Sequence, residues 1–155
     1  MSLVFRMFYL LVSSLFKPRL PHIKPCNELT MRVLPNDLDI NLHMNNGRYL
    51  TICDLTRVDM FIRTGLAKTM IKHKWMPIIT EHTMTYKKAL KPFQLYKVQM
   101  EVTGWDNRNF DMLHTFLVGG RVVAEGTSKG VIYSKKEGII TPERVIETVE
   151  SYLKP

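Results

Sequence analysis

The sequence is poor in cysteine, in acidic residues and in long uncharged apolar runs. Cys26 and Cys53 are the only cysteines among 155 residues. They are too few and too far apart for a disulfide framework or a metal-ligand spacing. Cys53 falls in a stretch of helical character, which favours a small buried apolar residue over a reactive thiol. This usage fits a reducing compartment, so we expect a cytoplasmic protein and predict no metal ion or cofactor.

Acidic residues are outnumbered by basic ones, 14 to 22, which gives a formal net charge of +8. Such an excess favours an acidic partner: nucleic acid, anionic lipid, the phosphates of a nucleotide-bearing substrate, or an acidic carrier protein. The basic residues are scattered and match no nucleic-acid-binding module. We therefore do not expect nucleic acid as the partner.

The longest apolar run covers residues 3–16 and is shorter than the roughly 20 residues that a spanning helix needs. Arg6, Ser13 and Ser14 interrupt the run and would cluster toward one side of a helix. That pattern fits either a helix docked on the protein body or one in peripheral contact with a membrane. We expect residues 1–26 to form this amphipathic helix and a linker, and residues 27–155 to form a single domain.

One long helix, residues 46–64, is expected after the linker, because its apolar residues occupy most of its circumference and Gly65 follows as a stop signal. The expected strands are 28–34, 75–89, 96–103, 110–118 and 121–134. Thr141 and Pro142 are typical of the start of a C-terminal helix. This order predicts an α+β fold in which an antiparallel sheet curls around the long helix. The open sheet edge favours a dimer with a continuous sheet.

The most informative motif lies directly before the long helix, where Asp39, Asn41 and His43 occupy alternate positions. In an extended backbone these side chains would project from the same side. A carboxylate, an amide and an imidazole would then face one space beside the free amides of a helix N-terminus. Such a space suits acyl chemistry, which needs an acid or base and donors for a developing oxyanion. Asp37, in contrast, is interpreted as a turn or cap residue.

The run DLDINLHMNNGRY, residues 37–49, resembles the active-site segment of plant acyl-ACP thioesterases. With the order of elements over residues 28–133, it is similar to the hotdog-fold thioesterases, including the 4-hydroxybenzoyl-CoA thioesterase family. The resemblance implies a hotdog fold. The N- and C-terminal helices expected from the residues lie outside the matching region, and the open sheet edge leads us to expect a homodimer or homotetramer. The resemblance also implies a substrate that is an acyl-CoA or an acyl-ACP thioester.

The resemblance assigns a role to each residue of the motif. Asp39 would be the catalytic carboxylate, acting on water or directly on the thioester carbon. Asn41 would hold the carbonyl or the carboxylate, and His43 would assist proton transfer or orient the water.

Three further residues follow at the start of the long helix. Asn46 and Gly47 would offer backbone amides to the oxyanion. Tyr49 would contribute to substrate binding.

One position departs from the plant pattern, because Ala89 stands where those enzymes carry a further catalytic glutamate. Glu81 is nearby in sequence, but no motif identifies it as a replacement for that glutamate. Two alternatives therefore stay open beside the thioesterase: a non-catalytic or weakly active acyl-binding protein that associates with membranes, and a hotdog hydratase, which the spacing disfavours. His82 and His114 have no second ligand near them in sequence and are assigned neither a metal nor a catalytic part.

Overall fold

The computed structural model of the protein describes residues 3–154. The helices are α1 (Leu3–Phe16), α2 (Asn46–Thr64), α3 (Leu66–His73) and α4 (Pro142–Leu153). The strands are β1 (Cys26–Arg32), β2 (Trp75–His82), β3 (Thr85–Tyr86), β4 (Leu95–Trp105), β5 (Phe110–Val118), β6 (Arg121–Ser134) and β7 (Gly138–Ile140).

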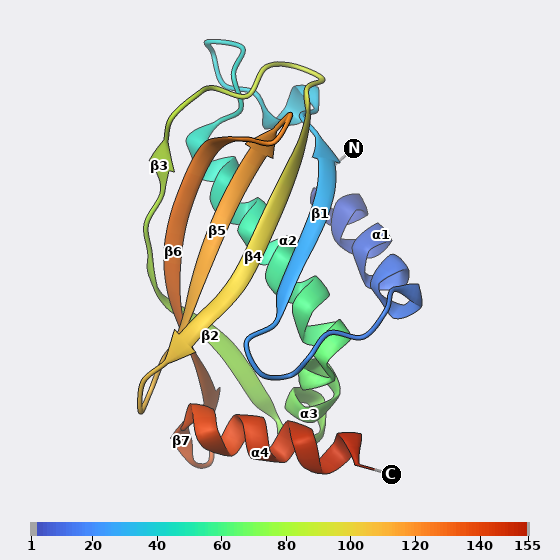
Figure 1. The fold of residues 1–155 in the computed structure, drawn as a ribbon, viewed down its shortest axis with the longest axis vertical. Helices are drawn as coiled ribbons and strands as arrows, with labels where there is room; N and C mark the ends of the chain where they lie inside the picture. Colours follow the sequence, from blue (N-terminus) through green and yellow to red (C-terminus); the bar gives the residue numbers. More distant parts are fainter. Residues whose placement is uncertain (1–2, 155) are drawn as a thin grey trace.

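The seven strands form one antiparallel sheet in the order β1-β4-β5-β6-β2, with β3 and β7 also paired to β6. The sheet curls around α2, and α4 crosses its lower end (Figure 1). β1 and β2 are the two edges of this sheet. The α+β architecture predicted from the sequence is confirmed.

Helix α2 is the centre of the core and spans the predicted residues 46–64. Its start is capped by the side chain of Asn45, which accepts a hydrogen bond from the amide of Gly47 at 2.9 Å. Its end is set by Gly65, whose φ of 86° is a left-handed conformation that glycine adopts at little cost. Ile52 and Leu55 are completely buried, and each contributes about 1.5–3 kcal/mol of hydrophobic stabilisation.

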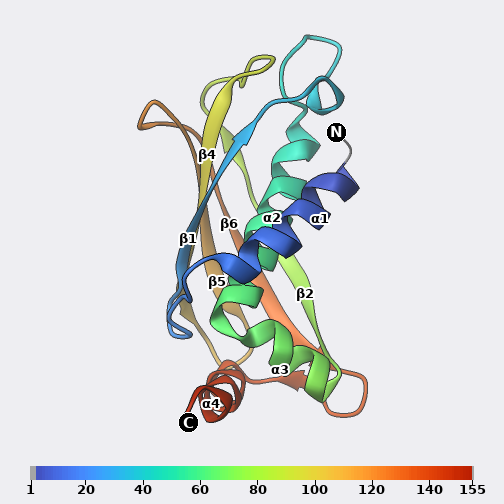
Figure 2. The same cartoon turned by 90° about the vertical axis from the view of Figure 1, so that its right-hand side faces the viewer.

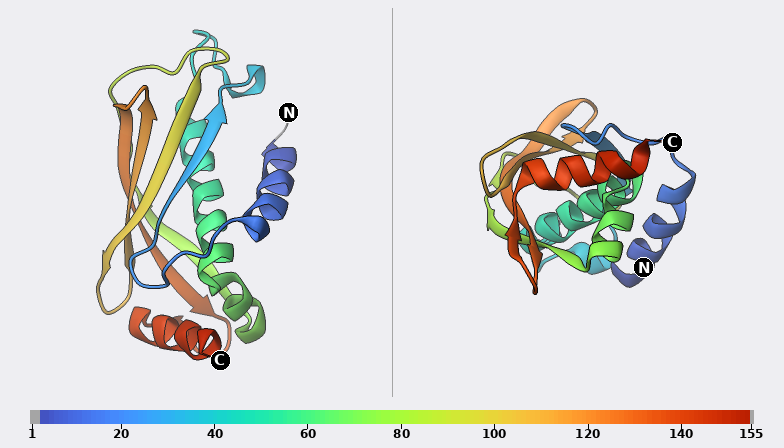
Figure 3. Two further views of the ribbon diagram at one scale, coloured as in Figure 1. Left: turned by 45° about the vertical axis from the view of Figure 1, so that its right-hand side comes forward. Right: turned by 90° about the horizontal axis from the view of Figure 1, so that it is seen from below.

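Helix α1 packs along α2 beside β1 (Figures 2 and 3). Its inner side carries buried Arg6, Leu10 and Ser14. Arg6 forms an ion pair with Asp37, and Ser14 donates to Asp59 at 2.6 Å. The docked helix is therefore the arrangement observed. No helix within residues 3–154 has both the length and the hydropathy to cross a membrane.

The structure differs from the sequence prediction mainly between residues 66 and 86, and again at β7. Helix α3 follows α2 directly and was not predicted, and neither was β7. The expected strand 75–89 is divided into β2 and β3, with a register shift between Ile79 and Glu81. Gly126 on β6 allows the connection between β2 and β3 to cross it, because a Cβ there would lie 2.0 Å from the carbonyl oxygen of Thr83.

Candidate functional site

The segment with Asp39 forms a tight loop that stands out at one end of the molecule, directly before α2 (Figure 1). The amide of Asp39 donates to the carbonyl of His43 at 2.8 Å, and Leu42 adopts a φ of 57°. The expectation of an extended backbone at this motif is therefore wrong. Local hydrogen bonding closes the loop, so alternate spacing does not by itself place the three side chains on one side.

The carboxylate of Asp39 is half-buried and helps to hold this loop together. Its Oδ1 accepts hydrogen bonds from the amides of Asn41 at 2.8 Å and His43 at 3.3 Å. The side chains of Asn41 and His43 are exposed. The loop thus presents a carboxylate with fixed backbone geometry, flanked by two polar residues in contact with solvent.

The residues predicted at the start of α2 occupy different environments. Asn46 and Gly47 are exposed in the first turn, beside the positive end of the helix dipole. The amide of Gly47 already donates to the Asn45 cap, so it can receive an oxyanion only if the cap is released. Tyr49 is only 2% exposed and packs edge-on against Tyr86, with ring centroids 5.0 Å apart. Its predicted role in substrate binding stays a prediction.

Asp37 fixes the base of the loop. It is 1% exposed and receives two hydrogen bonds from Arg6, at 3.0 and 2.5 Å. Arg48 on α2 approaches the same carboxylate to 3.2 Å, and the carbonyl of Asp37 accepts from the amide of Asn45 at 2.8 Å. Beyond the predicted turn role, Asp37 therefore joins α1, the loop and the first turn of α2. No local signal in the sequence pointed to the partner of Asp37, because Arg6 lies 31 residues away.

An apolar cavity of about 60 Å³ lies between α2 and the sheet. Its lining on α2 runs from Arg57 to Thr64, the C-terminal half of the helix, and includes Met60 and Phe61. Neither the Asp39 loop nor the first turn of α2 contributes to it. Met60 is fourteen residues beyond Asn46, which corresponds to about 21 Å along a helix.

A second polar group lies inside the fold and was missed by sequence reasoning. Cys53, His82 and His114 bring potential ligand atoms within 4.8 Å of one another. Cys53 is completely buried, as predicted, yet it is not surrounded by apolar groups alone. The three residues are separated by 29 and 32 positions, so only the pairing of the strands brings them together.

Residues 33–150 match the family model of the thioesterase-like superfamily. The chain belongs to the thioesterase-like superfamily. The match covers the Asp39 loop, α2 and all strands after it. Within this superfamily the order of elements and the curled sheet identify the fold as a hotdog fold, as the sequence resemblance implied.

The chain is also similar to curated proteins from animals. The chain is 27% identical over 118 residues to Protein THEM6 of Xenopus laevis, covering 76% of this chain and 55% of the relative. It is 30% identical over 86 residues to Protein THEM6 of Danio rerio, covering 56% of this chain and 43% of the relative. The chain therefore spans about half the length of these relatives.

Solved structures agree with this chain in fold. Gentisyl-coenzyme A thioesterase BH1999 superposes with a TM-score of 0.70 at 20% identity, covering 78% of this chain and 99% of that one. The protein SAV2348 of Staphylococcus aureus, solved in complex with CoA, gives a TM-score of 0.69 at 16% identity, covering 84% and 85%. At these identities the superpositions show the common fold alone.

Proposed function

We propose that this protein is a thioesterase that hydrolyses an acyl-CoA or acyl-ACP thioester at the Asp39 loop. The observation that carries the proposal is the position of Asp39: a carboxylate held in a loop directly before the N-terminus of α2, within the segment that matches the thioesterase-like superfamily. CoA in the SAV2348 structure and the net charge of +8 favour a CoA-type substrate.

In this proposal Asp39 activates a water molecule that attacks the thioester carbon, or attacks that carbon itself to form an acyl anhydride that water then hydrolyses. The thiol of CoA or of the carrier protein leaves, and Asn41 and His43 orient the reacting groups. The amide of Asn46 and the positive end of α2 stabilise the oxyanion. One such backbone donor is typically worth about 10²–10³ in rate. Release of the Asn45 cap would add the amide of Gly47 as a second donor.

We propose that a second copy of the chain completes the site. The Asp39 loop is exposed, and the apolar cavity of this chain lies beside the C-terminal half of α2, away from the loop. Strand β2 is an open edge of the sheet, and Met76 and Ile78 on it are 37% and 41% exposed. Antiparallel pairing of this edge with the same edge of a partner would cover both side chains and remove an unpaired strand. The proposed assembly is a homodimer, or a homotetramer built from such dimers.

The decisive experiment compares two aspartates with the same local hydrogen bonding. Asp106 sits in the loop between β4 and β5 and accepts from the amides of Arg108 and Asn109 at 2.7 and 2.6 Å, much as Asp39 accepts in its own loop. Asp39→Asn keeps an oxygen acceptor but removes the charge. We expect this change to lower thioester hydrolysis by about 10²–10⁴-fold.

Asp106→Asn is the matched control and should leave turnover unchanged. Free thiol release is measured over a panel of acyl-CoA substrates of increasing chain length, with melting temperatures recorded for both variants. Equal turnover in Asp39→Asn and the unaltered protein would remove Asp39 from the mechanism.

The runner-up is a non-catalytic acyl-binding hotdog protein, and two observations favour it. Ala89 replaces the plant-type glutamate, and the Asp39 carboxylate already serves its own loop. Saturable binding of acyl-CoA without any thiol release, over the whole substrate panel, would select this alternative.

A further inference from the structure

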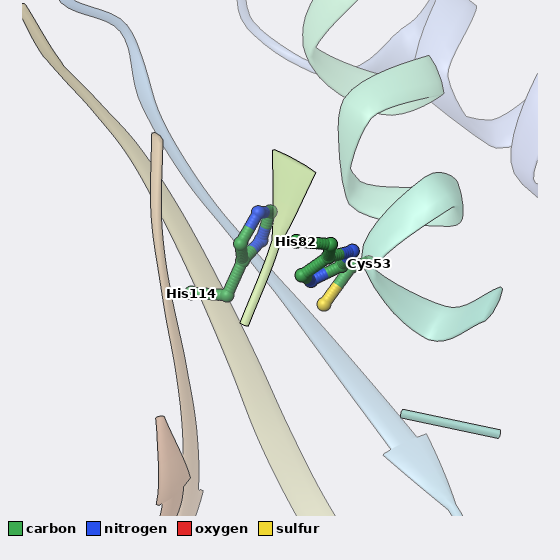
Figure 4. Close-up of side chains that lie close together, drawn as sticks. All are labelled: Cys53, His82 and His114. Carbon is green, nitrogen blue, oxygen red and sulfur yellow. The ribbon is translucent and has the colours of Figure 1, made fainter. Parts of the chain in front are cut away.

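The pairing of the strands explains how Cys53, His82 and His114 meet. On β6, Ser128 lies opposite His82 of β2, and Gly126 lies opposite His114 of β5. Positions 126 and 128 share one face of β6 because side chains alternate along a strand. Both imidazoles therefore lie over the same face of the sheet, and Cys53 approaches them from α2 (Figure 4).

Each histidine of this group has one nitrogen in contact with the protein and one without a partner. His114 Nε2 lies 2.8 Å from the hydroxyl of Ser128, and His82 Nδ1 lies 3.3 Å from Arg57 Nη2. His114 Nδ1 and His82 Nε2 are buried and have no hydrogen-bond partner. His114 itself is completely buried. An unsatisfied buried polar atom is destabilising, so the fold keeps these atoms at a cost that a ligand would offset.

We propose that Cys53, His82 and His114 bind a thiophilic divalent cation of the Zn²⁺ type. A thiolate and two imidazoles are the donor set that zinc prefers, at about 2.3 Å for sulfur and 2.0–2.1 Å for nitrogen. These lengths put ligand atoms about 3.3–3.6 Å apart in a tetrahedral site. In the structure the three ligand atoms lie within 4.8 Å of one another. Small side-chain rotations are therefore needed to bring them close enough to coordinate one cation. The contact of His114 with Ser128 is the kind of outer hydrogen bond that orients a metal-bound histidine.

The protonation of the group without a cation determines how cation binding depends on pH. Burial raises the pKa of the Cys53 thiol to about 12, so the thiol holds its proton. Burial lowers the pKa of His114 to about 3, with the charges of Arg57 and His82 acting in the same direction. Neutral imidazole is the form that binds metal, whereas the thiol must release its proton. Cation binding should therefore strengthen as the pH rises.

Arg57 is the charge that opposes a cation here, since it is 3% exposed and contacts His82. Two anions offset it: the Cys53 thiolate and Asp54, which forms an ion pair with Arg57. Coordination through His82 Nε2 moves the ring proton to Nδ1, so Arg57 Nη2 must leave that nitrogen. The Asp54 side chain is 58% exposed. The guanidinium of Arg57 can therefore move toward solvent while it keeps its ion pair with Asp54.

The test uses Co²⁺ as a spectroscopic substitute for Zn²⁺, with the full chain in a phosphine reductant that does not bind metal. Cys26 is exposed and Cys53 buried, so the chain carries its own control. In Cys26→Ser, a thiolate-to-cobalt charge-transfer band can arise only from Cys53. We expect this band in Cys26→Ser, saturating at one cobalt ion per chain, growing with pH and disappearing when Zn²⁺ is added.

His114→Gln keeps a polar group beside Ser128 and should weaken cobalt binding by at least about tenfold, the smaller effect known for altering even an outer partner of a metal ligand. Absence of the band in Cys26→Ser at millimolar cobalt would overturn the proposal and leave a buried water as the partner of the two histidines. Equal affinity in His114→Gln would overturn the proposed ligand set. Both readouts are independent of thioester hydrolysis.

Discussion

Two groups of buried polar side chains on α2 differ in how completely they are hydrogen-bonded. The carboxylate of Asp59 is 0% exposed and accepts from Ser14, Asn27, Lys17 and Arg63, at 2.6, 2.8, 2.9 and 3.1 Å. Around Cys53, nitrogen atoms of both neighbouring histidines and of Arg57 have no partner, whereas beside Asp59 the only such buried polar atom among the described residues is Asn27 Oδ1.

The difference separates a structural group from a candidate binding group. The Asp59 carboxylate accepts four donors from α1, the following linker, β1 and α2, so it has no capacity left for a ligand. Its function is to attach α1 and the linker to the core. The group at Cys53 is buried to a similar extent as Asp59, yet it has donors and acceptors without partners. This is the condition expected where a ligand supplies the missing partner.

The largest effect on folding is expected from Asp59→Ala. Removing this buried carboxylate leaves Arg63 and Lys17 without their ionic partner, although Arg63 Nε still donates to the carbonyl of Pro18. Breaking a buried ion pair costs about 3–5 kcal/mol. We expect a cost at the lower end of this range, because the Lys17 side chain is 31% exposed and can be hydrated. We expect a loss of about 3 kcal/mol in the free energy of unfolding by urea. Glu150→Ala, at an exposed ion pair on α4, should cost less than about 1 kcal/mol.

The same variant has a defined pH dependence. Burial alone would raise the pKa of Asp59, but its hydrogen bonds from Asn27, Ser14, Lys17 and Arg63 outweigh burial and place the pKa below its ordinary value. The stabilisation is therefore complete above the unfolded value of about 3.9 and is lost as the pH falls through the folded value. The difference between Asp59→Ala and the unaltered protein should shrink as the pH falls between these two values and level off below the folded value. A constant difference down to the acid limit would contradict this assignment.

A smaller effect is expected from Asp37→Asn, which tests whether α1 supports the Asp39 loop. Asparagine keeps one oxygen acceptor but removes the charge that pairs with Arg6, so we expect a loss of about 2 kcal/mol. Hydrogen exchange should increase in α1 and in residues 38–45 together, and kcat should fall more than KM changes. Asp111→Asn, at an exposed and loose ion pair with Lys129, should alter neither. Faster exchange in α1 alone would show that the loop is held independently.

The parts of the fold that were predicted correctly from the sequence are those set by individual capping and turn residues. The bounds of α2 follow from Asn45 and Gly65, whose cap and left-handed conformations are properties of those residues. The hairpin between β5 and β6 follows from Gly119-Gly120, both with positive φ. Helix α3 was missed because it begins directly after Gly65, without a loop and with only eight residues, too short for a reliable periodicity.

The candidate site could be predicted only as far as local spacing determines structure. The alternate spacing of Asp39, Asn41 and His43 is compatible with an extended segment and with a closed loop. In the structure, backbone hydrogen bonds within the segment close the loop. Contacts over long sequence separations gave no local signal. The ion pair of Arg6 with Asp37 belongs to this class, and so does the approach of Cys53 to His82 and His114, which depends on the register of three strands.

The smallest effect on folding is expected on the outer side of α1, the opposite of its ionic inner side. Phe5, Phe8, Tyr9 and Phe16 are 64–84% exposed there, a concentration of apolar surface that is unusual in a water-facing helix. With a net charge of +8, this side fits the surface of an anionic bilayer. Phe8→Ser combined with Phe16→Ser should change the free energy of unfolding by no more than about 0.5 kcal/mol.

Vesicle binding should nevertheless fall strongly in this double variant. The measurement is co-sedimentation with vesicles containing phosphatidylserine, compared with vesicles of phosphatidylcholine alone. These point changes are a sharper test than removal of residues 1–16, because truncation would also delete Arg6 and Ser14 and disturb both ionic anchors. Equal sedimentation of the double variant and the unaltered chain would exclude the outer side of α1 as the membrane contact, and its apolar residues would then require a protein partner.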